Sequence, residues 1–114
     1  MSLAFSQLFA SKQVNNAAPD TLFTVPSNPL NTILRNGRIR FVNTTTSLIT
    51  VKAWAVPLAS AAADANVMLP TTSIGINGYI DVDVPVLSAG GFVQAQAGAA
   101  ASITAHCLDG FLQS

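Results

Sequence analysis

The sequence predicts an all-β domain, an antiparallel β-sandwich of about eight strands in a jelly-roll-like arrangement. Three observations lead to this prediction. Apolar and polar residues alternate with a period of two in five segments, as on strands that bury one face. Dipeptides typical of turns separate these segments. Only 9% of the 114 residues are charged and none is Glu, so the composition excludes a disordered chain and a charged helical bundle.

The first 20 residues show no such alternation. Leu3, Phe5, Leu8 and Phe9 are apolar, and a polar run follows them. This segment is either an N-terminal arm that adds a strand to a neighbouring subunit or the first strand of the same sandwich. The sandwich domain itself is expected to span residues 21–114.

A short strand is expected over Leu22–Val25, and the turn-forming residues 26–29 end it. The next strand is clear from Arg38 to Phe41, where two arginines alternate with two large apolar residues. The Asn36-Gly37 dipeptide before it is typical of tight turns, so we expect it to join two strands as a hairpin.

Four further strands follow from the same alternation. A polar turn is expected at residues 43–47. Residues 58–65 are rich in alanine and are expected to form a loop with a short helical turn. The four strands are expected at Leu48–Val56, Ile80–Val84, Phe92–Ala97 and Ser102–Cys107.

The chain offers few residues for catalysis or metal binding. Its one histidine, His106, and one cysteine, Cys107, are neighbours on a strand and therefore point to opposite faces, so they cannot form a dyad. Asp81 and Asp83 share a strand face about 6.6 Å apart, which suits acid–base chemistry, calcium binding or a solvated or partner-facing surface. No further acid lies nearby in sequence, so we expect no catalytic residue, no metal, no cofactor and no enzyme activity.

Two groups of side chains are candidates for contacts with a partner protein. Arg35, Arg38 and Arg40 are three of the five basic residues, and they form either an ordinary polar face or a face that docks on an acidic partner. Trp54 either packs at the core edge or under a loop, or anchors an interface. The apolar residues of the first segment complete the set: Leu3, Phe5, Leu8 and Phe9.

Nucleic acid and membranes are not expected partners. The net charge is zero, so the chain has no overall field that attracts a polyanion, and the arginines lack interleaved aromatic residues. No run of about 18 apolar residues predicts a membrane span. The N-terminus lacks the basic and apolar regions of a secretory signal.

Four short segments form a combination found in known proteins. They are the TLFTVP opening at 21–26, the NTT turn at 43–45, the strand ending in VP at 49–57 and the Gly-led strand at 90–95. Together they resemble a widespread group of small virion proteins of tailed bacteriophages, over roughly Thr21 to Leu108. Gly91 stands where an acidic residue is common in that group, and the resemblance transfers no catalytic residue.

Members of that group are usually head decoration (cement) proteins or other virion surface components with β-sandwich folds. The resemblance implies a structural protein of the virion, made in the host bacterial cytoplasm. As a dimer or trimer, it would bind the major capsid protein on the outer face of the head and stabilise contacts between capsid subunits. The alternative is a tail- or fibre-associated receptor- or carbohydrate-binding module on the same sandwich, with Trp54, Asp81 and Asp83 lining a sugar site.

Overall fold

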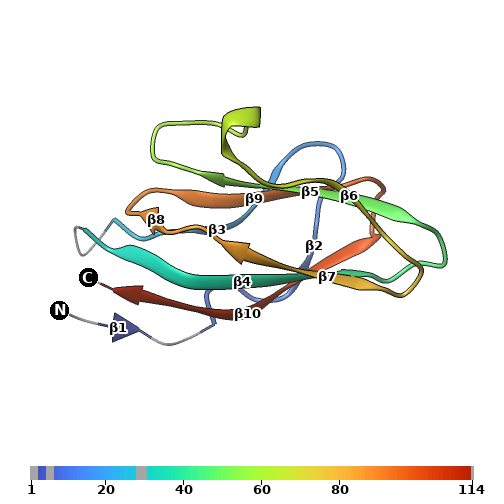
Figure 1. Cartoon of the computed structure of the whole chain (residues 1–114), viewed down its shortest axis with the longest axis horizontal. Coiled ribbons are helices and arrows are strands. Elements are labelled where there is room, and N and C mark those ends of the chain that lie inside the picture. Colours follow the sequence, from blue (N-terminus) through green and yellow to red (C-terminus); the bar gives the residue numbers. More distant parts are fainter. Residues whose placement is uncertain (1–2, 5–6, 28–30, 114) are drawn as a thin grey trace.

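The computed structural model describes residues 3–4, 7–27 and 31–113, and over these residues two antiparallel β-sheets pack face to face (Figure 1). The predicted all-β sandwich is therefore confirmed. The strands are β1 (Leu3–Ala4), β2 (Lys12–Gln13), β3 (Asp20–Thr24), β4 (Ile33–Asn43), β5 (Ile49–Val56), β6 (Val67–Ile74), β7 (Tyr79–Val84), β8 (Leu87–Ser88), β9 (Phe92–Ala97) and β10 (Ile103–Gln113).

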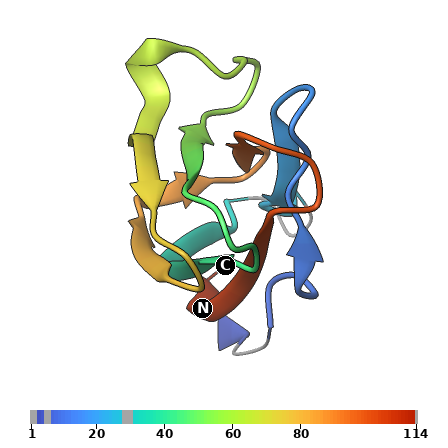
Figure 2. The same ribbon diagram turned by 90° about the vertical axis from the view of Figure 1, so that its right-hand side faces the viewer.

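The strand order is that of a jelly roll. The six-stranded sheet has the order β1-β10-β4-β7, with β2 beside β10 and β8 beside β4, and the four-stranded sheet has the order β3-β9-β5-β6. The pairs are nested along the chain: β5 with β6, β4 with β7, β3 with β9, and β2 with β10. A long antiparallel hairpin that rolls up into two layers has this pattern, and the two layers are seen end-on in Figure 2.

The N-terminal segment pairs with its own chain. In β1, Leu3 lies opposite Gln113 of β10, and in β2, Lys12 lies opposite Ala105 of the same strand. Val14, directly after β2, is 2% exposed and belongs to the core. These two short strands therefore extend the six-stranded sheet of the same chain.

The predicted inward rows meet between the two sheets. Ile39 and Phe41 of β4 and Ile103 of β10 come from the six-stranded sheet, and Ala53 and Ala95 face them from the four-stranded sheet. Phe41, Ala53, Ala95 and Ile103 are fully buried. Small residues on one sheet leave room for large ones on the other, so the layers can interdigitate at the density of a protein interior.

The predicted hairpin at Asn36-Gly37 is wrong, because β4 continues through both residues. Asn36 has a φ of 55°, and a Cβ at Gly37 would lie 2.9 Å from the Cβ of Val84 on β7. Opposite these residues, the register of β10 against β4 shifts between Asp109 and Phe111, and Gly110 there has a φ of 143°. A β-bulge needs the same left-handed residue and close backbone approach as a tight turn, so the dipeptide alone does not distinguish them.

The strand β6 was not predicted from the sequence. Its residues do not alternate, and Pro70 interrupts it. Because β6 is an edge strand, the missing amide of Pro70 costs no ladder hydrogen bond on the outer side, and the register against β5 shifts nearby. The loop before it contains the expected short helical turn, the 3₁₀-helix η1 (Asp64–Asn66).

A buried amide ties together the loops at one end of the sandwich. Asn43, fully buried, donates from Nδ2 to the carbonyl oxygens of Ser47 (2.8 Å), Ile74 (2.9 Å) and Gly75 (3.1 Å). Its Oδ1 accepts hydrogen bonds from the backbone amide (3.0 Å) and the hydroxyl (2.7 Å) of Thr45. One side chain therefore holds the β4–β5 loop against the end of β6.

Replacing Asn43 by alanine should lower the free energy of unfolding by about 2–4 kcal/mol, because it leaves buried carbonyl groups without donors. Urea unfolding followed by tryptophan fluorescence measures this change. Thr46→Ala, an exposed position in the same loop, is the matched control and should change the value by less than about 0.5 kcal/mol. Equal unfolding midpoints for Asn43→Ala and the wild type would contradict this role of the amide.

Candidate functional site

The outer face of the six-stranded sheet brings together the charged residues singled out in the sequence. In the antiparallel register, Arg40 of β4 lies opposite Asp81 of β7 on one side and His106 of β10 on the other. One step along the strands, Arg38 lies opposite Asp83. The arginine pair and the aspartate pair, 41 residues apart in the chain for Arg40 and Asp81, therefore form one face.

Arg40 makes a bidentate ion pair. Its Nε donates to Oδ1 of Asp81 at 2.7 Å, and its Nη2 donates to Oδ2 at 3.0 Å. The guanidinium carbon also lies 4.1 Å from the ring centroid of Tyr79, a cation–π distance. The hydrogen bond from Arg40 is the main cause that lowers the pKa of Asp81 below its ordinary value. The same hydrogen bond raises the pKa of Arg40.

Arg38 is more loosely paired. Its Nε lies 3.6 Å from Oδ1 of Asp83, whose side chain is 92% exposed, and its Nη2 lies 3.9 Å from Oδ2 of Asp81. Arg35, exposed on the same strand, has no ion pair among the described residues. Two of the three arginines proposed to dock on an acidic partner thus have carboxylates within their own sheet.

The apolar residues of the first segment lie against the chain's own core. Leu8 and Phe9 are half-buried and pack on the core cluster. Leu8 closely approaches Gly110 of β10, where an added Cβ would lie 2.7 Å from Leu8 Cδ1. Leu3 belongs to β1, and Phe5 lies outside the described residues.

Trp54 is 6% exposed and lies on β5, between the buried residues of the four-stranded sheet. The ammonium of Lys52 lies 5.4 Å from its ring centroid, and η1 lies next to this strand (Figure 1). Trp54 is therefore buried within its own chain. A sugar site built jointly from Trp54, Asp81 and Asp83 is contradicted, because the two aspartates belong to the other sheet.

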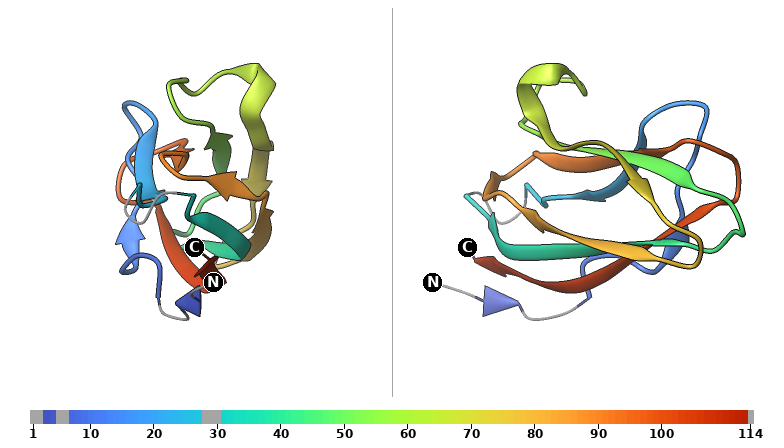
Figure 3. Two further views of the ribbon diagram at one scale, coloured as in Figure 1. Left: turned by 90° about the vertical axis from the view of Figure 1, so that its left-hand side faces the viewer. Right: turned by 45° about the vertical axis from the view of Figure 1, so that its right-hand side comes forward.

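The sequence interpretation missed one apolar surface. Leu48 is 65% exposed and Ile76 is 60% exposed, and they sit on the β4–β5 and β6–β7 loops that Asn43 connects. Both loops lie at the same end of the sandwich (Figure 3). We call Leu48 and Ile76, with loops 44–48 and 75–78, the loop end. The signal available in the sequence was a large aliphatic residue beside turn-forming residues, Leu48 after Ser47 and Ile76 before Asn77-Gly78.

Groups that could carry chemistry are sparse on the described part of the chain. Ser11 Oγ lies 2.8 Å from Nδ1 of His106, and Cys107 is half-buried with a free thiol. Within the described residues, no three His, Cys, Asp or Glu side chains gather as a metal site would require. The same residues contain no helix long and apolar enough to cross a membrane.

No protein-family model matches the chain, and a search of the curated proteins finds no match.

The Arg40–Asp81 pair predicts a specific loss of stability in acid. The pKa of Asp81 is lower in the folded protein than in the unfolded chain, where an aspartate has a pKa of about 4. The ion pair therefore stabilises the fold fully above about pH 4, and this stabilisation is lost as the pH falls through the pKa of Asp81 in the folded protein. Urea midpoints of the wild type and Asp81→Asn should differ by a constant amount from pH 5 to 7, and the difference should shrink below about pH 4.

Asp83→Asn is the control for this measurement. Its carboxylate is 92% exposed, so its ion pair with Arg38 should contribute little at any pH. If the urea midpoints of the wild type and Asp81→Asn differ by the same amount at pH 3 and at pH 7, the ion pair does not stabilise the fold through the ionised carboxylate.

Proposed function

We propose that the chain is a structural virion protein, a capsid decoration (cement) protein that binds the outer face of a tailed-phage head. It stabilises contacts between major capsid subunits and acts as a homo-oligomer. Two kinds of support exist. The segments at 21–26, 43–45, 49–57 and 90–95 resemble such virion proteins, and jelly rolls are common in viral capsid domains.

The observation that carries the proposal is the loop end. Two large aliphatic side chains stand 65% and 60% exposed at one end of the sandwich. Exposed large aliphatic groups that belong to one surface mark contact sites more often than isolated ones do, and Asn43 joins the two loops that carry Leu48 and Ile76. Covering such a side chain contributes about 1.5–3 kcal/mol, so each copy on a shell would gain a modest binding energy through this end.

The loops are ordered before they meet a partner. The Nδ2 of Asn43 reaches carbonyl oxygens on both sides of the loop end, at Ser47 and at Gly75. Because these loops are already fixed, binding costs little further loss of conformational entropy. A rigid apolar end suits a protein that must add stability at many equivalent positions of a shell.

The charged face contributes little to long-range attraction. Arg40 and Asp81 neutralise each other at 2.7 Å, and the whole chain has no net charge. Docking that depends on apolar burial should therefore persist at high salt, whereas docking through free arginines would weaken.

Co-sedimentation with purified empty phage heads that lack the protein tests the proposal. The wild type should bind at a fixed stoichiometry, in low and in high salt. The double variant Leu48→Ser, Ile76→Ser should bind at least about tenfold more weakly, because both apolar contacts are lost.

Leu58→Ser is the matched control, since Leu58 is 68% exposed on a different loop, after β5. It should bind heads as the wild type does. Wild-type protein that stays in the supernatant would contradict the function. Binding that the double variant retains in full would contradict the role of the loop end.

A further inference from the structure

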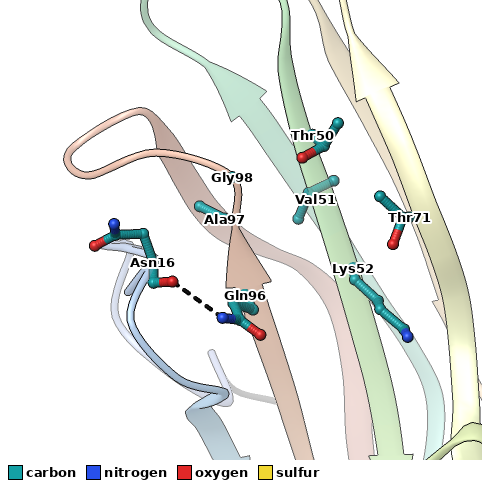
Figure 4. A pocket seen from close by; sticks show the side chains of 8 residues that line it. All are labelled: Asn16, Thr50, Val51, Lys52, Thr71, Gln96, Ala97 and Gly98. Atoms are coloured by element: carbon teal, nitrogen blue, oxygen red, sulfur yellow. Dashed lines mark hydrogen bonds between the residues drawn. The ribbon is translucent and has the colours of Figure 1, made fainter.

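A polar hollow lies on the outer face of the four-stranded sheet, with a volume of about 280 Å³. Figure 4 shows Thr50 and Lys52 of β5 and Thr71 of β6 along one side, and Asn16 and Gln96 along the other. No aromatic ring lines it, and its lining combines hydroxyls, amides and one ammonium group with the aliphatic side chains of Val51 and Ala97.

Several hydrogen-bonding groups of the hollow are left unused by the protein. Gln96 donates from Nε2 to the backbone carbonyl of Asn16 at 3.0 Å, which fixes its amide. Within the described part of the chain, no hydrogen bond engages Gln96 Oε1, the side-chain amide of Asn16, or the hydroxyls of Thr50 and Thr71. The hydroxyls can donate and accept and Gln96 Oε1 can accept, and these groups lie around one space in Figure 4, whereas the side-chain amide of Asn16 points away from it.

Gly98 keeps the hollow open. A Cβ at this position would clash with Oγ1 of Thr50. Its backbone amide donates to the carbonyl of Thr50 at 2.8 Å, so β9 and β5 are held close at the end of the hollow. A side chain larger than glycine would push the Thr50 hydroxyl away from its present place.

The charge in the hollow is balanced. Lys52 is the one ionisable residue among its lining residues, and its Nζ lies 3.9 Å from Oδ1 of Asp64. The ammonium also lies over the Trp54 ring. A ligand that matches these groups is therefore neutral and rich in hydroxyls, not an anion.

We propose that this hollow binds one ring of a neutral saccharide through the amide of Gln96 and the hydroxyls of Thr50 and Thr71. Sugar hydroxyls donate and accept in the same way as these groups, and the volume is close to the lower limit of small-ligand sites, about 300 Å³. The proposal is independent of capsid binding, because the hollow is formed by residues outside the loop end.

Titration of ¹⁵N-labelled protein with glucose, galactose, mannose and N-acetylglucosamine tests the site. At least one sugar should shift the backbone amide resonances of Thr50, Gln96 and Gly98 with a dissociation constant in the range of about 1–10 mM. Gln96→Ala should weaken binding about fivefold, since one amide contact is lost. Thr71→Ala, which removes an exposed hydroxyl without a protein partner, should weaken it by a similar factor.

Gln94→Ala is the matched control. Gln94 belongs to the same strand and the same outward row, but its amide bonds to Thr21 outside the hollow. This variant should bind as the wild type does. Absence of shifts with all four sugars up to about 50 mM would overturn the proposal. So would equal weakening by Gln94→Ala, or shifts of the same amides by inorganic phosphate alone.

Discussion

The pairing of β4 with β10 supports the rest of the structure. The two strands, each 11 residues long, run side by side from Ile103 opposite Asn43 to Gln113 opposite Ile33. On its other edge, β10 pairs with β1 and β2, and β4 likewise pairs with β7 and β8. A pair this long must twist and bend, and the bulges at Asn36 and Gly110 provide the bend where the two backbones come close. The β4–β10 pair is therefore the centre of the six-stranded sheet, and every other strand of that sheet pairs with one of the two.

The same register decides which surfaces remain for partners. It places Arg40 between Asp81 and His106, so the strongest charges of the outer face are matched inside the sheet. It also ends β4 at Asn43, whose buried side chain then holds the loop end in place. The charges of Arg40 and Asp81 are thus paired within the sheet, while Leu48 and Ile76 of the loop end stay exposed.

Local patterns in the sequence predicted most of the longer strands and their faces. Alternation placed Ile39 and Phe41 inward and Arg38 and Arg40 outward, as found. It failed for β6, because an edge strand with Pro70 does not need to alternate. It also failed at Asn36, where a bulge and a turn require the same backbone conformation.

The candidate surfaces depend on pairing between distant segments, which local patterns do not encode. Two arginines and two aspartates with the same spacing, Arg38 and Arg40 against Asp81 and Asp83, were visible in the sequence as separate pairs. Only the antiparallel register of β4 and β7 makes them one neutral face. Likewise, Leu48 and Ile76 are exposed on two loops that Asn43 joins at one end of the sandwich, and the sequence of either loop alone does not show that they meet.

Hydrogen–deuterium exchange of the protein, free and bound to empty phage heads, tests this account most directly. Bound protein should exchange more slowly at the amides of residues 44–48 and 75–78 and nowhere on the outer faces of β4 and β7. The paired amides between β4 and β10 should be slow in both states, since they open only with the whole fold. Unchanged exchange at residues 44–48 and 75–78 in the bound protein would contradict the account.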